Sequence, residues 1–554
     1  MKRTSRLLAL VTAFLGSATA HAIVDMKTAN YSQTWTDIDV PSAANQFKLK
    51  VDRTYNSRSL FDGMFGFGWC SDFETRLDIT PEGNIRLIEC GSGQETVYMP
   101  LEFNRKDIDK TIAAILPKLR QQQGMDEKAL KALQEEMVSN AKLRAKYAAD
   151  FKIKVEPKEG MQYFANGREV EKFVFSKNVY TRTLVSGTQM RFNTQGRMTH
   201  MYDAAGNFLR FEYDKDQVRE VVDNNGRKLS FKYFNNKKVK AISGPNGTTA
   251  EYKFEGLDDL NWVKNQWGNI YTYAYDDRHN LVKVNYPDKT SIQIGYNQER
   301  DWVTKFVDRD KCTEDYGYEL SKSDPKMHYW STVKKVCRKE IVNESKHEFI
   351  HKKRDDGQVY LQRVISTING SVTDITYHEV FNRPLTIRRN AETSNFEYYA
   401  NGQIRTKSTR LTRMTYQYDK KSQKVSEVQT TVLNDKGKAV TSRKTAFQYD
   451  AKGNLTFASN SEGQRVRMTY DGRGRIKTIT DQARKVVRID YEERFGKPAV
   501  VSRPGLGTIR VSYKANGDID KVNSAEGPTV AMQVASTFNN LLDILSPASP
   551  EVYN

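Results

Sequence analysis

Aromatic residues recur along this 554-residue chain with a period near 21, and this spacing constrains its fold more than any other feature. Such a period is typical of a repeat architecture, in which each unit is one supersecondary element packed on its neighbours. The chain is therefore better read as one repeat body than as several separate domains. The repeat positions are Phe192, Tyr213, Tyr233, Phe254, Tyr275, Tyr296, Tyr377, Tyr398, Tyr418, Tyr449, Tyr470, Tyr491 and Tyr513.

Each repeat contains the same short pattern after its aromatic residue. Tyr449 is followed by Asp450, by Gly453 and then by the apolar Leu455, and the segment that starts at Tyr470 has the same order. A polar turn with Asp and Gly between alternating apolar runs indicates a β-hairpin. A single hairpin cannot bury its apolar face, so we expect successive hairpins to stack with their aromatic residues along a continuous inner face.

This pattern resembles the YD repeat of the RHS family, which includes bacterial polymorphic toxins, cocoon-forming components of insecticidal toxin complexes, and the teneurins. The segments 53–59 and 63–69, which contain Arg53-Thr-Tyr55 and Gly66-Phe-Gly68-Trp69, are similar to the region before the repeats in bacterial members. The resemblance implies a mainly β fold, in which a hairpin array spirals into a shell-like barrel. Toxin-bearing members end in an Asp-Pro-x-Gly-Leu-type motif with self-cleavage. The nearest segment here, residues 503–507, lacks that Asp, so we expect neither self-cleavage nor a C-terminal toxin domain.

Two segments depart from the β pattern. Apolar residues at helical spacing on both sides of Gly124 predict a helical hairpin over residues 105–150, and a similar stripe predicts a helical C-terminal tail. The predicted organisation is a signal peptide (1–22), a β lead-in domain (23–104), the helical insertion (105–150), the YD-repeat shell (151–527) and the helical tail (528–554).

The first 22 residues have the features of an export signal. Lys2, Arg3 and Arg6 precede a short apolar run, and small residues at Ala20 and Ala22 suit cleavage before Ile23. No later run reaches the roughly 20 apolar residues of a transmembrane helix. We therefore expect a periplasmic, cell-surface or secreted protein.

The four cysteines are Cys70, Cys90, Cys312 and Cys337. An even number of cysteines in an exported chain is compatible with two disulfides. Proximity in sequence favours Cys70–Cys90 and Cys312–Cys337, although all three pairings stay open and buried free thiols are the alternative. We expect the second pair to close an irregular insert over residues 312–345, whose Met327–Trp330 cluster suits either sugar stacking or a local core.

The segment His347-Glu348-Phe349-Ile350-His351 matches the His-Glu-x-x-His pattern of zinc hydrolases. That chemistry needs a helix, which places both His side chains on one face. The flanking residues, with an Asp-Gly turn at 355–357, instead predict a β-hairpin. In a strand the two histidines are about 13 Å apart along the chain and cannot share one metal ion.

The formal net charge is +19, or +16 once Lys2, Arg3 and Arg6 are removed. Because Lys and Arg are spread over the whole length, they predict no specific nucleic-acid site and only a diffuse attraction to anionic polymers. The leading hypothesis is an exported, non-enzymatic scaffold without a cofactor that binds envelope glycans or encloses a polypeptide. The alternatives are the carrier or remnant of a toxin system whose effector is encoded separately, and a zinc hydrolase using His347, Glu348 and His351.

Overall fold

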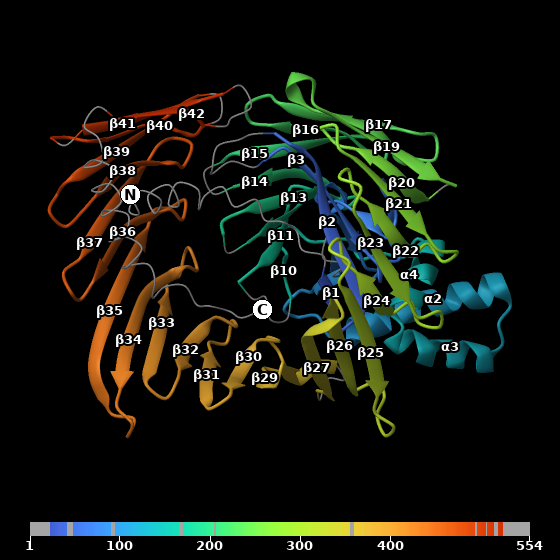
Figure 1. The fold of residues 1–554 in the computed structure, drawn as a ribbon. Coiled ribbons are helices and arrows are strands. Elements are labelled where there is room, and N and C mark those ends of the chain that lie inside the picture. Colours follow the sequence, from blue (N-terminus) through green and yellow to red (C-terminus); the bar gives the residue numbers. More distant parts are fainter. Residues whose placement is uncertain are drawn as a thin grey trace.

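The protein is mainly β, and a single antiparallel ribbon of 33 strands makes up most of it (Figure 1). This result confirms the predicted fold class. The computed structural model describes residues 23–40, 48–89, 95–165, 170–184, 186–203, 206–256, 258–354, 359–493, 496–505, 507–514 and 519–524. The predicted export signal (1–22), the predicted helical tail (528–554), Cys90 and the turn at 355–357 lie outside these residues.

In the ribbon every strand pairs with the strands before and after it, so the described strands form an open meander with β10 and β42 at its edges. Its first fifteen strands are β10 (Gln162–Phe164), β11 (Lys172–Ser176), β12 (Val179–Thr183), β13 (Gln189–Asn193), β14 (Met198–Tyr202), β15 (Phe208–Asp214), β16 (Gln217–Asp223), β17 (Lys228–Tyr233), β18 (Val239–Ser243), β19 (Thr249–Glu255), β20 (Asp259–Lys264), β21 (Ile270–Tyr275), β22 (Leu281–Asn285), β23 (Ser291–Tyr296) and β24 (Val303–Val307). The rest are β25 (Thr313–Leu320), β26 (His328–Cys337), β27 (Glu340–Lys353), β28 (Val359–Ile368), β29 (Ser371–Tyr377), β30 (Pro384–Arg389), β31 (Glu392–Tyr398), β32 (Ile404–Ser408), β33 (Thr412–Tyr418), β34 (Val425–Leu433), β35 (Ala439–Tyr449), β36 (Leu455–Asn460), β37 (Arg465–Tyr470), β38 (Ile476–Thr480), β39 (Val486–Tyr491), β40 (Pro498–Arg503), β41 (Gly507–Tyr513) and β42 (Ile519–Ser524).

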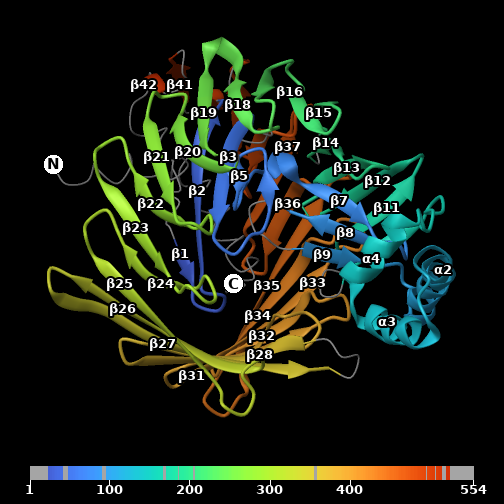
Figure 2. The same cartoon turned by 90° about the vertical axis from the view of Figure 1, so that its right-hand side faces the viewer.

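The lead-in module precedes the ribbon and lies partly inside its curve. Figures 1 and 2 show β2 and β3 on the concave side of the green strands β19–β23. The module contains three small sheets, ordered β1-β2-β3-β6, β4-β5 and β7-β8-β9, and one 3-10 turn (Asp72–Glu74). Its strands are β1 (Ile23–Asp25), β2 (Asn30–Asp39), β3 (Lys50–Asn56), β4 (Asp62–Gly63), β5 (Gly66–Phe67), β6 (Trp69–Cys70), β7 (Arg76–Ile79), β8 (Ile85–Ile88) and β9 (Glu95–Tyr98).

The helical insertion consists of three helices rather than the predicted pair: α2 (Arg105–Gln123), α3 (Glu127–Ser139) and α4 (Ala141–Asp150). α2 ends at Gly124, whose φ of +60° suits glycine. The third helix begins because the Asn140 side chain accepts a hydrogen bond from the Leu143 N–H and so caps a new helix. A buried ion pair between Arg144 and Glu82 (2.6 Å) joins the helices to the lead-in module.

The segment 312–345 is also more regular than predicted. It is not an irregular insert but contains β25, β26 and the start of β27, which continue the ribbon. The β25–β26 and β26–β27 pairs extend over eight and ten residue pairs, which are longer than most other pairings in the ribbon. The Met327–Trp330 cluster therefore lies at the start of a strand, and Tyr329 stacks on Phe349 in a small apolar cluster.

The lead-in motif contacts the ribbon through backbone as well as side chains. The Phe67 N–H donates to the Asp258 carbonyl (3.1 Å), and a Cβ on Gly66 would lie 2.0 Å from that oxygen. Only glycine permits this approach, because Gly66 also has a φ of +95°. Nearby, the Trp69 indole donates to Tyr275 Oη (2.8 Å). The motif that precedes the repeats in sequence is therefore the part that docks on them.

At the centre of this interface Arg53 and Asp37 form an ion pair with no side-chain exposure. Arg53 Nε lies 2.6 Å from Asp37 Oδ2, and Arg53 Nη2 donates to the Tyr273 hydroxyl (2.6 Å). The Tyr252 hydroxyl donates to the same carboxylate oxygen (3.0 Å). The guanidinium lies 4.7 Å from the centroid of the Trp69 ring, within cation–π range. Lead-in and ribbon thus share one buried charge cluster.

The period near 21 has a physical cause in the strand pairing. The register shifts by one residue in most alternate strand pairs of the ribbon, and such a shift falls directly before each predicted repeat position. For example, it falls between Gln448 and Tyr449 and between Thr469 and Tyr470. A β-bulge of this kind leaves one backbone group without its ladder partner. The same shift precedes Phe192, Tyr213, Tyr233, Phe254, Tyr275, Tyr296, Tyr377, Tyr398, Tyr418, Tyr491 and Tyr513.

The tyrosine of the next repeat occupies the bulge of the one before it. Leu455 lies opposite Tyr449, and its carbonyl accepts a hydrogen bond from Tyr470 Oη (2.7 Å). Burial raises the pKa of Tyr470 to about 12, so its hydroxyl stays a donor at neutral pH. We call each such bond a tyrosine latch. The latch donors are Tyr213, Tyr233, Tyr275, Tyr296, Tyr318, Tyr398, Tyr418, Tyr449, Tyr470, Tyr491 and Tyr513, at 2.5–3.0 Å.

Tyr318 is the member of this series that the period analysis missed. It follows Tyr296 by 22 residues and donates to the Val303 carbonyl (2.7 Å), although no register shift precedes it.

The aspartates that follow the repeat tyrosines close the hairpin turns. Asp450 Oδ1 accepts the backbone N–H groups of Lys452 and Asn454, both at 2.9 Å. These aspartates are therefore structural.

We predict that Tyr470→Phe lowers the free energy of unfolding by about 1 kcal/mol, because the Leu455 carbonyl loses its donor. Hydrogen exchange at β36–β38 should speed up while exchange in the first repeats stays unchanged. Tyr163→Phe is the matched control, because the Tyr163 hydroxyl is buried and has no hydrogen-bond partner among the residues that the structure describes. An equal loss in both variants would contradict the latch.

A second prediction concerns the charge cluster. Arg53→Met should cost about 3–5 kcal/mol, because it leaves the Asp37 carboxylate buried without a counter-charge. The double variant Asp37→Leu/Arg53→Met should lose clearly less stability in urea unfolding. A double variant as unstable as the sum of both single variants would show that the two groups act independently.

Candidate functional site

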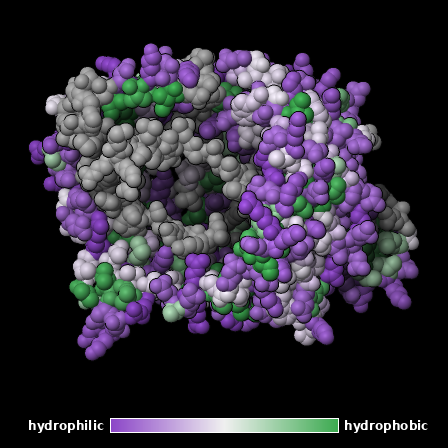
Figure 3. Space-filling view, viewed as in Figure 1, coloured by the Kyte–Doolittle hydropathy of each residue, from purple (hydrophilic) through white to green (hydrophobic). Residues whose placement is uncertain are grey.

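The two halves of the ribbon bury their concave face in different ways. In the first half, the core combines ribbon residues such as Val221 and Ile242 with lead-in residues such as Trp35 and Val51. In the second half, the core cluster around Tyr416, Val466 and Ile479 contains ribbon residues only. Among the described residues, the lead-in module therefore lines only part of the concave face. Figure 3 shows a hollow at the centre of the molecule and a largely hydrophilic outer surface.

A row of directly paired side chains crosses the concave face of the second half. Phe396 on β31 lies opposite Lys407 on β32, Lys407 opposite Met414 on β33, and Met414 opposite Thr430 on β34. Phe396 is buried, and the other three are half-buried. This mixed row, together with Ser394 two residues before Phe396, is the candidate site on the inner wall. The sequence signal for this row is the alternation of inward-facing and outward-facing residues within each strand, which is separate from the 21-residue spacing of the aromatic residues.

The convex face of the late strands carries exposed arginines. Arg467, Arg488 and Arg510 alternate with buried or half-buried apolar residues on β37, β39 and β41. These arginines contribute positive charge to the outer surface of the ribbon. The inner face of these strands is therefore mainly apolar, whereas their outer face carries positive charge.

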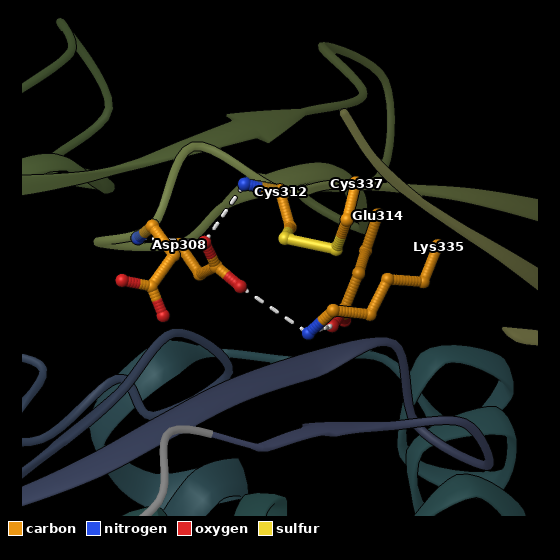
Figure 4. The surroundings of a disulfide bond; sticks show 6 residues. Asp308, Cys312, Glu314, Lys335 and Cys337 are labelled. Atoms are coloured by element: carbon orange, nitrogen blue, oxygen red, sulfur yellow. Dashed lines mark hydrogen bonds and ion pairs between the residues drawn. A yellow bond between two sulfur atoms is a disulfide. The ribbon is translucent and has the colours of Figure 1, made fainter. Parts of the chain in front are cut away.

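A disulfide joins β25 and β26 near the boundary between the two halves (Figure 4). It links Cys312 to Cys337, the pairing favoured by proximity in sequence. Beside it, the Lys335 ammonium lies 3.2 Å from Asp308 and 3.0 Å from Glu314. Cys70 is disulfide-bonded as well, and its expected partner Cys90 lies outside the described residues.

The His-Glu-x-x-His segment lies within strand β27, not on a helix. His347 bonds Ser345 (3.0 Å) and Ser366 (2.8 Å), while the Glu348 carboxylate lies 2.7 Å from His328 Nε2. His351 instead lies near the Met327 carbonyl (3.3 Å). The described residues contain no group of three or more His, Cys, Asp or Glu side chains placed to hold a metal ion. The zinc-hydrolase alternative has no helix to support it.

A cavity of about 550 Å³ lies between the lead-in module and ribbon residues of β15–β17 and neighbouring turns, and Glu74 lines it. Burial raises the pKa of Glu74 to about 7. Its carboxylate accepts the backbone N–H groups of Met64 (2.6 Å) and Ser71 (3.1 Å), and it closes a capping box with Ser71. These bonds account for Glu74 as a structural residue.

None of the described helices is long and apolar enough to cross a membrane.

We predict a pH dependence of stability from His347. Burial lowers its pKa below the ordinary 6.5, so the unfolded chain binds a proton at a higher pH than the folded protein does. The contribution of this group to stability is complete above pH 6.5 and is lost as the pH falls below it. Urea unfolding at neutral and at mildly acidic pH measures the change. His347→Gln should reduce the loss on acidification, and an unchanged loss would exclude His347 as its source.

Comparison with known proteins supports the repeat assignment. The family model described as Teneurin YD-shell matches residues 181–341, and the RHS Repeat model matches residues 449–485. A domain of unknown function (DUF6531) matches residues 22–98, which cover most of the lead-in module. No curated protein matches the chain.

Solved structures with a similar arrangement are much longer than this chain. The crystal structure of TcdB2-TccC3-TEV is 10% identical, with a TM-score of 0.43, and the match covers 95% of this chain and 29% of that one. The crystal structure of TcdB2-TccC3-Cdc42 is 11% identical (TM-score 0.38), with 89% and 28% covered. The Photorhabdus luminescens Tc holotoxin pore is 10% identical (TM-score 0.26), with 87% and 35% covered.

The chain therefore spans about a third of the length of these proteins. The assignment itself rests on the family models together with the bulges and latches described above, which recur at the predicted positions. The chain carries a teneurin YD-shell domain and an RHS repeat within one continuous ribbon.

Proposed function

We propose that this protein is an exported scaffold whose ribbon holds a partner polypeptide against its concave face. The observation that carries the proposal is the unequal lining of that face. The lead-in module packs into the first half, whereas the described part of the second half contributes its own residues alone to its core. A polypeptide on the second half would take the place that the lead-in module takes on the first.

The chemistry of the inner row suits an extended peptide rather than a small charged ligand. Lys407 lies between the apolar Phe396 and Met414, with the hydroxyls of Ser394 and Thr430 nearby. Apolar side chains of a guest would find apolar contacts, while its backbone would find hydroxyl groups and one ammonium. Affinity would then be spread over many weak contacts.

Export is part of the proposal. The N-terminal residues have the order of a signal peptide, and the disulfide between Cys312 and Cys337 suits an oxidising compartment. The periplasm, the cell surface and the medium are all consistent with these features. A guest encoded as a separate toxin effector would make the protein a toxin carrier, and the identity of the guest decides this point.

Site-specific photo-crosslinking tests the proposal on the full chain, expressed with its signal in an exporting host. A photoreactive residue at Ser394 faces the concave side, whereas one at the adjacent Asn395 lies on the opposite face of β31 and serves as the matched control. We expect a covalent adduct with a co-exported polypeptide from position 394 and none from position 395, because only the inner face is lined by a guest.

Mass spectrometry of the adduct identifies the guest. Adducts that contain only residues 525–554 of the chain itself would show that the scaffold fills its own interior, which contradicts a separate partner. Equal adducts from both positions would indicate nonspecific contact and would also count against the proposal.

A further inference from the structure

A cavity of about 380 Å³ lies where the lead-in strand β2 meets the ends of β20, β21 and β22, away from the inner row described above. Gln33 and Trp35 line it from β2, Trp267 from the β20–β21 turn, and Tyr271 and Tyr286 from the ribbon. Three of its sides thus carry aromatic rings, and amide groups lie between them. Of these side chains, Trp35 also packs against Arg53 and Trp69 beside the buried charge cluster, whereas the other four take part in neither that cluster nor the latches.

The turn that carries Trp267 is shaped before any ligand arrives. Asn265 Oδ1 accepts the backbone N–H groups of Trp267 (3.1 Å) and Asn269 (3.0 Å). Gln266 bonds both backbone groups of Asp39 on β2, accepting from its N–H (3.1 Å) and donating to its carbonyl (3.2 Å). Lead-in and ribbon together therefore order the turn that carries Trp267, which lowers the entropic cost of binding.

The opposite wall is equally constrained. The rings of Tyr271 and Tyr286 meet edge to face at 5.8 Å, and Gln33 Nε2 donates to the Tyr286 hydroxyl (3.1 Å). The Arg309 guanidinium lies 4.5 Å from the Tyr286 ring centroid and donates to Thr290 Oγ1 (2.8 Å). Each of these side chains has a partner that holds its orientation.

Two indole groups at this cavity need separate description: the exposed ring of Trp267 and the buried N–H of Trp35. Trp267 is 55% exposed, the most exposed aromatic side chain among the described residues. The Trp35 side chain is only 6% exposed, yet its indole N–H has no hydrogen-bond acceptor in the described part of the protein. A buried N–H without a partner costs free energy, and so does a large exposed ring. The Trp35 N–H is itself inaccessible to solvent, so the exposed face of Trp267 is the surface that a ligand can reach, and a ligand with an apolar face would cover it.

We propose that this cavity binds one or two units of a neutral glycan. A pyranose ring presents C–H groups on its faces, which stack on the negative faces of Trp and Tyr rings, and hydroxyls at its edge, which pair with amides such as Gln33 and Asn269. The volume falls in the range of small-molecule sites. Arg309, the cation of the site, is paired with Asp288, so the cavity offers no free charge for a phosphate or a sulfate.

This site is independent of the concave row and goes beyond the proposed function. A scaffold that holds a guest inside and a sugar at the junction of lead-in and ribbon could attach its guest to a glycan-coated surface. Loss of one activity would leave the other in place. The two proposals therefore fail separately.

The test uses the full chain and a panel of mono- and disaccharides of glucose, galactose, mannose and N-acetylglucosamine, with binding followed by saturation-transfer NMR and calorimetry. We expect at least one of these sugars to bind and Trp267→Ala to weaken it about ten-fold or more, because the stacking surface is lost. Phe234→Ala is the control, since Phe234 is also exposed (38%) but does not line the cavity. Thermal unfolding confirms that both variants fold.

Three outcomes would overturn the proposal. The first is no binding to any sugar of the panel. The second is binding that Trp267→Ala leaves unchanged. The third is preferential, salt-sensitive binding of heparin or of adenosine monophosphate, because that result would assign the surface to anionic ligands.

Discussion

The hydrogen bond from each latch tyrosine to a carbonyl of the preceding repeat is the interaction on which the ribbon depends. A long antiparallel meander curves evenly only if each hairpin is bent in the same way. The bulge supplies the bend, and the tyrosine hydroxyl satisfies the backbone group that the bulge leaves without a partner. Where consecutive repeat positions are latch donors, as from Tyr449 to Tyr513, the acceptor of one latch lies opposite the tyrosine of the previous one, so the bends are connected in series.

The latch explains the spacing, but it does not explain where the ribbon obtains its core. A single curved sheet has too little to pack against, and the protein meets this need differently in its two halves. In the first half, the lead-in strands and the cluster of Arg53, Asp37, Tyr252 and Tyr273 fill the concave side. In the second half, the described core consists of ribbon residues. The same repeat therefore forms one half that packs on the lead-in module and one half whose described core contains ribbon residues only. This contrast underlies the role proposed for the inner face.

Much of this architecture could be predicted from the sequence, since the period, the Asp-Gly turns and the strand at 347–351 all depend on local chemistry. The errors came from information that local patterns do not contain. The helix that starts at Asn140 depends on a side-chain cap within an already helical segment. The regular strands over 313–345 were missed because the two-strand units there are longer than one 21-residue period and Tyr318 lies one residue out of step. The cavity beside Trp267 joins residues more than 200 positions apart, which no short pattern reveals.

The position of the lead-in module has a consequence for how the chain folds during its synthesis. Ribbon strands contact their immediate neighbours, so each hairpin can form as soon as its own residues emerge. The lead-in module emerges first, yet Arg53 meets Tyr273 only after 220 further residues. Until then Trp35, Trp69 and the charge pair have no ribbon to cover them. The part of the protein that is synthesised first is therefore completed only after about half of the chain has been made, and the nascent chain carries an exposed aromatic surface throughout that interval.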